Sequence, residues 1–531
     1  MQSPTLSTPD DDDRLRTRLG QAGFTPGRRD VAPLVAMVVG GDDGVAVRRA
    51  LERAPAELVA RAAIAALTAA SDDDAAGARL LAVLGDTAVR DPSARAAVIA
   101  AVQDARPRTR RAATIALGKL GGDDARAALL ALWDQAALAP ELRRAAADAL
   151  GKVGGPEAQA RLAAAEVGDD RELARRRDRA LLISERDASA APSTIVLDRA
   201  PPAPVVVVAR CRTGLETLLA AELDEIGLHP HRLGVGRVLV DLDGPLAALA
   251  QARTLLTAGV YVPIAGATAE AIADALAAPP VLALLAAWTD GPVRWRLDFE
   301  SGGHRRALVW SAAAAVRGRT AALINQPRET TWDVIVGADE RHLELRPRSL
   351  GDARFPWRVA EIPAASHPTI AAALARVAAP LPGDTIWDPF VGSAGELCEI
   401  ARLGGARLLG TDLDERSLTA ARANLTAAGA IARAELHPID ALTYAPRPVD
   451  VIVTNPPMGM RLRGDVGALL EAFAARVPSL LRPRGRLVWL TPVPGRTQGP
   501  LRAAGLRRSF ARDVDLGGHE VMLERWERWE R

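Results

Sequence analysis

The chain has 531 residues, which is too long for a single hydrophobic core and long enough for about three domains. It carries 67 basic and 65 acidic residues, and this balance excludes a dedicated basic nucleic-acid binder, so any nucleic-acid contact must come from a local patch. The two cysteines, Cys211 and Cys398, have no metal-ligand spacing, which argues against a disulfide framework or a structural zinc ion and predicts no metal site.

The N-terminal segment contains the acidic run Asp10 to Asp13 and lacks the apolar stretch of a signal peptide. We predict that residues 1–29 form a disordered acidic tail. No run of about 18 uncharged apolar residues occurs, so we expect no membrane span. Together with the cysteine usage, these features predict a cytoplasmic protein.

Residues 30–182 show Ala, Leu and Arg at helical spacing, which predicts successive helices. The segment 110–122 returns as 143–155, an offset of 33 residues, and each copy ends in a Gly-Gly pair suited to a left-handed helix end. Weaker copies lie at 58–67 and 94–102. The period is that of a helical solenoid, and the motif resembles short HEAT repeats. The sequence leaves open whether this region is a scaffold with solvated arginines or a concave surface that binds RNA or a protein partner.

Residues 183–204 are rich in Ser, Ala and Pro and are predicted to form a linker. The next region, 205–350, has an α+β texture. It opens with a strand at 205–209 and an amphipathic helix at 215–226. Short strands are expected near 237–241 and 293–299.

The last region, 351–531, alternates strands with helices. The predicted strands are 385–387, 407–411, 433–437, 449–454 and 486–491, with helices ending near 403 and 481 and one at 418–428. Strict alternation at this length predicts a doubly wound, Rossmann-like sheet with helices on both faces.

The first turn of this sheet follows an apolar strand and is built from small residues before a helix begins. Small residues let the backbone approach a ligand closely, and a helix N-terminus favours negative charge there. The alternative is an ordinary tight turn. The cofactor-binding candidates in this segment are Asp388, Pro389, Phe390, Gly392, Ser393 and Gly395.

Acidic residues also follow the next two strands. Asp412 lies 24 residues after the first aspartate of the turn, a normal spacing for an acceptor of ribose hydroxyl groups. A helix N-cap is the alternative, but Asp414 fits that role better, so we assign ribose to Asp412, with Leu413 beside it. Asp440 and Ala441 are placed to receive an adenine amino group.

The most specific motif is Asn455-Pro456-Pro457-Met458, which ends a hydrophobic strand. Proline has no amide hydrogen and a fixed φ, so this turn holds its carbonyl groups outward and rigid. An exocyclic amino group of a base can donate to the Asn455 side-chain oxygen and to the Pro456 carbonyl. These contacts orient the nitrogen toward a sulfonium methyl group and stabilise developing positive charge, so we predict that the four residues are catalytic. The alternative is a rigid turn without chemistry.

In this order the motifs resemble those of the class I methyltransferases that use S-adenosylmethionine to modify exocyclic nitrogens. The strongest resemblance is to the THUMP-domain RNA guanine-N2 methyltransferases, whose corresponding motifs read D-P-F-C-G-S-G and N-P-P-Y-G. It covers residues 205–531. The resemblance implies S-adenosylmethionine as cofactor, the N2 amino group of guanine as acceptor, and RNA as substrate, with tRNA favoured over ribosomal RNA.

Stretches outside the catalytic motifs support the same resemblance. Residues 210–216 resemble the opening of the ferredoxin-like subdomain that precedes THUMP, and residues 301–306 and 324–334 resemble stretches within THUMP. Residues 366–370 resemble the segment that closes over the cofactor. THUMP modules engage the acceptor end of tRNA, and the alternative for each basic candidate is a solvated surface side chain. The implied RNA-binding residues are Arg305, Arg306, Arg317 and Arg319.

Three positions depart from the family pattern. Val391 stands where cysteine is common, a position without a chemical role. Ala394 replaces a glycine, which a methyl group tolerates if φ is negative, with Gly395 supplying flexibility. Met458 replaces an aromatic residue expected to stack on the flipped base, a contact worth about 1–3 kcal/mol, and a thioether packs less strongly. Substrate identity and the degree of activity therefore stay open.

The predicted fold class is multidomain: an N-terminal HEAT-like α-solenoid, an α+β ferredoxin-like and THUMP module, and a C-terminal α/β Rossmann-like methyltransferase domain. The same catalytic motif occurs in DNA adenine-N6 and protein glutamine-N5 methyltransferases, and the THUMP-like segment favours RNA. A 23S ribosomal RNA guanine-N2 methyltransferase is the nearest rival. The non-enzyme alternative is an RNA-binding scaffold with a weakened catalytic domain, whose HEAT-like region recruits protein partners.

Overall fold

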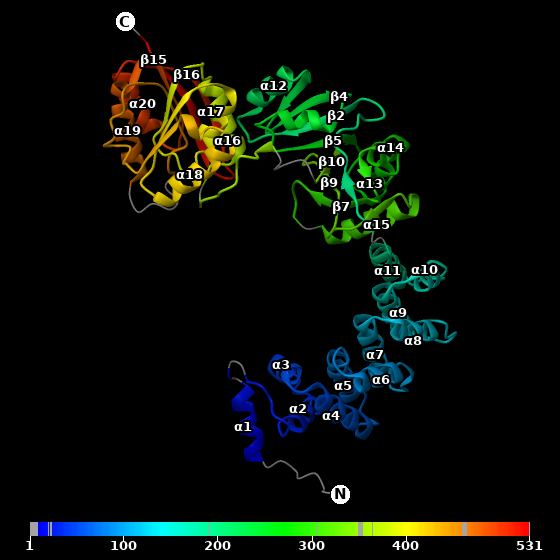
Figure 1. Cartoon of the computed structure of the whole chain (residues 1–531). Helices are drawn as coiled ribbons and strands as arrows, with labels where there is room; N and C mark the ends of the chain where they lie inside the picture. Colours follow the sequence, from blue (N-terminus) through cyan, green and yellow to red (C-terminus); the bar gives the residue numbers. More distant parts are fainter. Residues whose placement is uncertain are drawn as a thin grey trace. The chain divides into compact units, whose positions relative to one another are not determined.

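The computed structural model describes residues 9–19, 21, 24–188, 191–303, 305–348, 354–363, 365–458 and 465–529 (Figure 1). The chain divides into two compact units. The first comprises Met1–Pro192 and Arg306–Gln326, and the second comprises Ser193–Arg305 and Pro327–Arg531. His304 and Gly459, which belong to the THUMP-like and catalytic segments of the sequence, lie outside the described residues.

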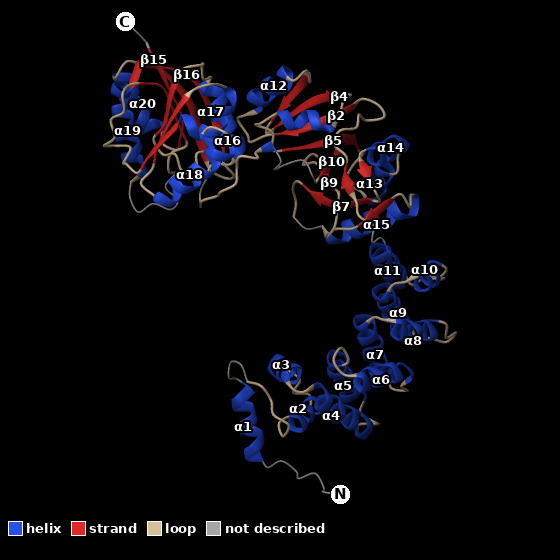
Figure 2. Cartoon of the chain, viewed as in Figure 1, coloured by secondary structure: helices blue, strands red, loops and turns tan. Residues whose placement is uncertain are grey.

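The described part of residues 1–192 is almost entirely helical (Figure 2). Its helices are α1 (Pro9–Leu19), α2 (Val31–Val39), α3 (Val45–Arg53), α4 (Ala56–Ala69), α5 (Asp74–Thr87), α6 (Pro92–Ala100), η1 (Ala101–Gln103), α7 (Pro107–Leu120), α8 (Asp123–Trp133), α9 (Pro140–Val153), α10 (Pro156–Ala163) and α11 (Arg171–Ala188). The first unit also contains α15 (Arg306–Arg319) and β8 (Leu323–Asn325).

Within residues 1–29, which the sequence predicts to be a disordered tail, residues Pro9–Leu19 form helix α1. This helix buries Leu15, and it is tied to the following residues by ion pairs from Arg16 to Asp42 at 2.5 Å and from Arg18 to Asp30 at 2.9 Å. The apolar contact and the two ion pairs hold a segment whose acidic composition alone favours disorder.

The repeat seen in the sequence corresponds to two matching helices, α7 and α9. Their first residues, Pro107 and Pro140, are also 33 residues apart. As predicted, each helix ends at a glycine pair with positive φ. Gly121 and Gly154 have φ of 64° and 62°, values that favour glycine over residues with a Cβ atom.

Close helix approach recurs with the same period. A Cβ atom on Gly118 in α7 would lie 2.8 Å from the Cα atom of Ala149 in α9, and one on Gly151 would lie 2.5 Å from the Cα atom of Ala180 in α11. Gly85 in α5 is the equivalent residue one period earlier, and a Cβ atom there would lie 2.9 Å from a side-chain atom of α7. Glycine therefore sets the distance between successive helices of this stack.

Replacing Gly118 with alanine is expected to lower the free energy of unfolding by about 1–3 kcal/mol, because the added methyl group overpacks the contact with α9. Gly318→Ala in α15 is the matched control, since a Cβ atom there meets nothing within 4 Å. It should be neutral or stabilising by up to about 1 kcal/mol. Urea unfolding followed by circular dichroism measures both. Equal effects would contradict the packing argument.

The predicted linker, residues 183–204, is shorter than expected. Helix α11 continues to Ala188, and β1 (Thr194–Ile195) pairs with β6 (Thr289–Asp290) in the second unit. The indole nitrogen of Trp288 donates to the Arg199 carbonyl at 2.8 Å. Backbone hydrogen bonds thus incorporate part of the proline-rich stretch into the fold, which composition alone does not reveal.

The α+β part of the second unit contains seven strands of one sheet in the order β3-β4-β2-β5-β10-β9-β7. These strands are β2 (Val205–Arg210), β3 (Pro230–Gly234), β4 (Arg237–Leu242), β5 (Thr257–Pro263), β7 (Val293–Phe299), β9 (Trp332–Val336) and β10 (His342–Pro347). The helices are α12 (Glu216–Glu225), η2 (Leu246–Gln251), α13 (Ala269–Leu276) and α14 (Pro279–Ala287). Among the described residues no single helix is long and apolar enough to cross a membrane. Only α13 and α14 together, bent by 60°, reach the required length and composition.

The C-terminal part forms a seven-stranded sheet in the order β13-β12-β11-β14-β15-β17-β16. Its strands are β11 (Thr385–Asp388), β12 (Arg407–Thr411), β13 (Ala434–His437), β14 (Val449–Thr454), β15 (Leu481–Thr491), β16 (Leu506–Asp515) and β17 (Glu520–Arg528). The helical elements are α16 (Pro368–Ala378), α17 (Gly395–Leu403), α18 (Glu415–Ala427), η4 (Ile431–Arg433), α19 (Val466–Leu480) and α20 (Pro494–Ala503). The first five strands in this order are parallel, as predicted, and the sequence analysis missed the antiparallel pair β16 and β17.

A buried ion pair joins the two parts of the second unit. Arg253, which precedes β5, contacts Glu399 of α17 with Nη2 and Oε1 2.5 Å apart, and both side chains are at least 90% buried. The indole nitrogen of Trp357 donates to the same carboxylate at 2.7 Å. Such a pair is stable only when both charges keep close partners, so the contact fixes α17 against the α+β part.

Candidate active site

The four polar residues predicted from the strand ends lie along one edge of the C-terminal sheet. Asp388 ends β11, Asp412 follows β12, Asp440 follows β13, and Asn455 follows β14. Because β11 to β14 are parallel neighbours, their carboxyl ends meet at the same edge, where open α/β sheets bind ligands. The structure therefore brings these candidates together.

The loop between β11 and α17 is held by hydrogen bonds from both sides. The Phe390 amide donates to Oδ1 of Asp388 at 3.1 Å, and the Gly392 amide donates to Oδ2 of Asp412 at 3.0 Å. The Thr411 hydroxyl donates to the Pro389 carbonyl at 3.1 Å. Gly392 has a φ of 50°. The bonds fix this small-residue loop at the N-terminal end of a helix, a position that favours an electronegative ligand.

Ala394 departs from the expectation of a negative φ. It has a φ of 64°, is fully buried, and forms the N-cap of α17. The left-handed conformation costs a residue with a Cβ atom about 1–2 kcal/mol. Gly395, expected to supply the flexibility, is instead the first helical residue. The turn therefore keeps its glycine-type backbone while carrying a methyl group.

The two aspartates after β12 have separate roles. Oδ1 of Asp414 accepts from the Arg416 amide at 3.0 Å and caps α18, as the sequence analysis predicted. Asp412 accepts from the Gly392 amide and, through Oδ1, from the Asp414 amide at 2.9 Å. Each of its oxygens keeps a further lone pair, so the ribose assignment remains compatible with the geometry. Leu413 between them is 72% exposed and offers an apolar surface at this edge.

The turn after β13 is stabilised by a residue that the sequence analysis missed. Oδ1 of Asp440 accepts from the Leu442 amide at 2.8 Å. Arg476 of α19 donates to the carbonyls of Ala441 at 2.6 Å and Tyr444 at 2.9 Å. The second oxygen of Asp440 has no role in these bonds, and Arg476 fixes the loop around it. No sequence motif signals this arginine, because it lies on a later helix.

Asn455 is anchored through only one end of its side-chain amide. Its Nδ2 atom donates to Oγ of Ser366 at 2.8 Å, and Ser366 donates to Oε1 of Glu396 at 2.5 Å. Oδ1 of Asn455 is buried and has no hydrogen-bond partner among the described residues. An unsatisfied buried acceptor costs about 1–3 kcal/mol, a cost that a ligand donor would remove.

Two buried carboxyl groups lie behind this edge. Burial raises the pKa of Asp388 well above its usual range, and the neighbouring Glu396 raises it further. Burial also raises the pKa of Glu396, while the hydrogen bond from Ser366 opposes that rise. Oδ2 of Asp388 has no hydrogen-bond partner among the described residues. The neighbouring Thr454 hydroxyl acts in the opposite direction to burial and lowers the pKa of Asp388. A buried carboxyl beside a glycine turn can meet a ligand that brings its own hydrogen-bond donor, as an amino acid or nucleoside moiety does.

The segment before α16 is tied onto the β11 loop. Oδ1 of Asn424 accepts from the amides of Val359 and Ala360 at 3.0 and 2.9 Å. Its Nδ2 atom donates to the carbonyls of Ala360 at 3.0 Å and Ser393 at 2.9 Å. This fully buried asparagine places the segment that contains Ser366 next to the loop. The segment is visible in the sequence through its family resemblance, whereas Asn424 has no distinguishing motif.

The remaining candidates are less closely grouped. Pro456 is buried, whereas Pro457 and Met458 are half-buried, and the residues that follow them lie outside the described structure. Arg305 is paired with Glu340 at 2.7 Å and belongs to the second unit. The other predicted RNA-binding residues, Arg306, Arg317 and Arg319, lie on α15 in the first unit.

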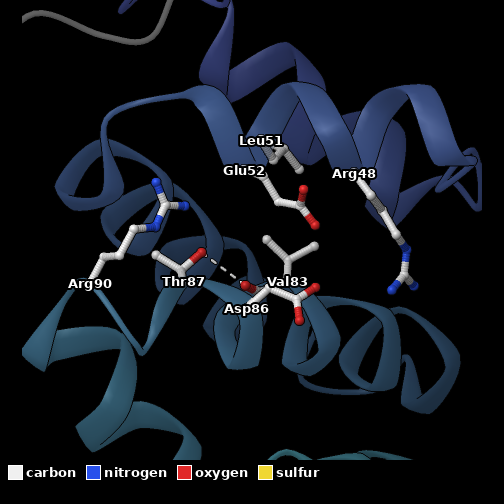
Figure 3. A pocket seen from close by; sticks show the side chains of 7 residues that line it. All are labelled: Arg48, Leu51, Glu52, Val83, Asp86, Thr87 and Arg90. Atoms are coloured by element: carbon white, nitrogen blue, oxygen red, sulfur yellow. Dashed lines mark hydrogen bonds between the residues drawn. The ribbon is translucent and has the colours of Figure 1, made fainter. Parts of the chain in front are cut away.

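The first unit has a hollow between α3 and α5 (Figure 3). Its lining residues are Arg48, Leu51, Glu52, Val83, Asp86, Thr87 and Arg90. The Thr87 hydroxyl is used within its own helix, where it donates to the Val83 carbonyl at 2.8 Å. None of these residues is among the candidates from the sequence. Within the described residues, no group of three or more His, Cys, Asp or Glu side chains is arranged to hold a metal ion.

Residues 356–521 match the family model described as an RMKL-like methyltransferase domain. A tRNA (guanine(6)-N2)-methyltransferase of Thermus thermophilus is 35% identical over 183 residues, which is 33% of this chain and 53% of the relative. The chain thus spans about half the length of the curated relatives it matches.

Solved structures are similar over a longer range. TrmN from Thermus thermophilus is 25% identical, with a TM-score of 0.51, over 61% of this chain and 99% of TrmN. SMU.472, crystallised with SAH, has a TM-score of 0.50 at 17% identity over 62% of this chain and 99% of that protein, which shows a shared fold. The similarity supports a methyltransferase-like α/β fold for the C-terminal part.

Replacing Asp388 with asparagine is expected to stabilise the fold at neutral pH, because an amide carries no charge into this buried position. The Asp388 carboxyl has an ordinary pKa of 3.8, and folding raises it. The carboxyl therefore favours folding only while it is protonated. The advantage of the variant should be absent below pH 3.8 and grow as the pH rises toward the raised pKa. Urea unfolding across this pH range measures the difference, and a pH-independent difference would refute its electrostatic origin.

Replacing Ala394 with glycine is expected to raise the free energy of unfolding by about 1 kcal/mol, because glycine adopts a positive φ without steric cost. Ala427→Gly, in the exposed last turn of α18, is the control and should lower it by about 0.5–1 kcal/mol. Thermal or urea unfolding distinguishes the two. If both variants lose stability equally, the left-handed backbone carries no strain.

Proposed function

We propose that this chain is an S-adenosylmethionine-dependent methyltransferase that acts on the exocyclic N2 of a guanine in tRNA. The match of residues 356–521 to a methyltransferase domain supports the reaction class, and the Thermus tRNA (guanine(6)-N2)-methyltransferase supports the acceptor. Guanine at position 6 of tRNA is therefore the first target to test.

The observation that carries this proposal is the state of the Asn455 side chain. Its Nδ2 atom is already bonded to Ser366, so Oδ1 is the atom left to meet a donor. An amino group of a base is such a donor. The amide oxygen and the Pro456 carbonyl can accept its two hydrogens, which directs the nitrogen lone pair away from the turn. Partial negative charges at these oxygens also stabilise the positive charge that the nitrogen gains.

The cofactor would be held along the sheet edge by residues that fit its parts. Gly392 and Ser393 allow close backbone approach at the N-terminal end of α17, Asp412 would accept from ribose, and Asp440 would accept from adenine. When bound, S-adenosylmethionine supplies an electrophilic methyl group. The buried edge around Asp388 keeps water out, which strengthens each polar contact that the protein makes there.

The finer features of the substrate site are also proposals. We assign Met458 a packing role against the target base, weaker than the stacking of an aromatic ring. Residues 205–350 are proposed to be a ferredoxin-like and THUMP module that binds tRNA, with Arg305, Arg306, Arg317 and Arg319 as basic contacts. Arg305 also forms an ion pair with Glu340. The helical stack is proposed to be a HEAT-like solenoid that binds a protein partner. We also propose that the protein is cytoplasmic.

Nucleoside mass spectrometry of tRNA and ribosomal RNA from a strain lacking the gene tests the substrate. We expect N2-methylguanosine to fall in tRNA and to be unchanged in ribosomal RNA. Complementation with the intact gene should restore it. A normal tRNA profile, with loss in 23S ribosomal RNA instead, would favour the rival substrate.

Two variants test the assigned roles. Asn455→Ala is expected to lower kcat by about 100-fold or more with little change in S-adenosylmethionine affinity, because the side chain faces the acceptor amine. Asp412→Ala should instead weaken cofactor binding first. Isothermal calorimetry and single-turnover methylation of tRNA separate these effects. If both variants fail only in cofactor binding, Asn455 is not an acceptor-site residue, and if wild type does not bind S-adenosylmethionine, the chain is a scaffold.

A further inference from the structure

We infer that Ser366 and Glu396 are positioning residues, which fix the rotational state of the Asn455 amide so that its oxygen faces the acceptor amine. This inference rests on the proposed function, since it assigns Asn455 to an amino-group substrate. The inference adds Ser366 and Glu396 to the site, and neither belongs to the motif that begins at Asn455. Each comes from a different element: Ser366 precedes α16, Glu396 lies in the first turn of α17, and Asn455 follows β14.

An asparagine side chain needs such a device because its two ends are nearly equal in shape and opposite in function. The oxygen accepts hydrogen bonds, whereas the NH2 group donates them. If the amide plane turned by half a turn, the NH2 group of Asn455 would face the NH2 group of the base. That arrangement offers the base no acceptor and removes the contact that orients its nitrogen.

Ser366 can select the correct rotamer because a hydroxyl has only one hydrogen. That hydrogen is donated to Oε1 of Glu396 at 2.5 Å, which leaves only lone pairs on Oγ for other partners. Oγ therefore accepts from Nδ2 of Asn455, at 2.8 Å, and cannot donate to Oδ1. The direction of these two hydrogen bonds is therefore set by Glu396, the acceptor at the end of the series.

Glu396 is suited to be that acceptor while it is ionised. Its side chain is 3% exposed, so water does not compete for Ser366. The charged groups around it are acidic: Asp388 at the end of β11 and Glu399 one turn along α17, with Asp412 beyond Asp388. Burial raises the pKa of Glu396 and Glu399 raises it further, while the hydrogen bond from Ser366 lowers it. Once protonated, Glu396 can donate to Ser366, which frees the serine hydrogen to turn toward Asn455 and allows the opposite amide rotamer.

The test compares Ser366→Ala with Asn455→Ala and with the double variant. Ser366→Ala is expected to lower kcat by about 10- to 100-fold, with S-adenosylmethionine affinity within about twofold of wild type. If Ser366 acts through Asn455, it adds no further loss in the Asn455→Ala background. Ser366→Thr keeps a hydroxyl and should recover part of the rate. Ser509→Ala is the matched control, since this exposed serine also donates to a glutamate, Glu527, at 3.0 Å and should leave kcat unchanged.

The pH profile tests Glu396. In wild type, kcat should fall as the pH decreases through the raised pKa of Glu396, because the protonated acid no longer fixes the serine hydrogen. Glu396→Gln removes the ionisable group, so this acidic limb should disappear. Persistence of the same limb in Glu396→Gln would overturn the role of Glu396.

A readout independent of substrate keeps the inference separable from the proposed function. In the cofactor-free wild-type chain, the Nδ2 hydrogens of Asn455 should be protected from solvent exchange in 15N nuclear magnetic resonance, with the signal assigned by its loss in Asn455→Ala. Ser366→Ala should abolish that protection. Unchanged protection, or a kcat loss that adds fully to that of Asn455→Ala, overturns the inference. If the amide behaves as expected but no guanine N2 is methylated, the positioning role stands and the proposed acceptor is wrong.

Discussion

The candidate site depends on one geometric constraint: parallel strands deliver their carboxyl ends to a single edge of the sheet. Asp388, Asp412, Asp440 and Asn455 are separated by up to 67 residues in the sequence, yet each ends or follows one of four neighbouring parallel strands. The hydrogen bond from the Gly392 amide to Asp412 then joins the first two strand ends directly. The site is therefore a consequence of topology, and short loops suffice to build it.

The same edge carries a cost in stability. Asp388 and Glu396 are buried carboxyl groups whose pKa is raised by burial, Ala394 adopts a left-handed backbone, and Oδ1 of Asn455 lacks a partner among the described residues. Each feature opposes folding, and each lies within the loop or strand end that would meet a ligand. Such local strain persists only where the surrounding structure enforces it, and it concentrates at functional sites.

The sequence predicts those parts of the site that depend on residues close together in the chain. Strand alternation and the Asn455-Pro456-Pro457 turn locate the parallel sheet and its edge, and Asp414 is identified as a cap from its position alone. The segment of Ser366 is visible in the sequence but its contact with Asn455 is not, and Asn424 and Arg476 escape prediction, because each contributes through a contact between distant segments. Likewise, the acidic composition of residues 1–29 gives no hint of the apolar contact and ion pairs that hold α1 in place.

Helix α17 combines the two kinds of contact, since Glu396 and Glu399 are three residues apart and face different partners. Glu396 receives the hydrogen bond that leads to Asn455, whereas Glu399 forms the buried ion pair with Arg253 of the α+β part. A shift of this helix would disturb the amide network and leave a buried charge without its partner, and losing the partner of a buried charge costs about 3–5 kcal/mol. Helix α17 thus couples the α+β part to the edge of the sheet that carries the candidate site, because one face of it serves each.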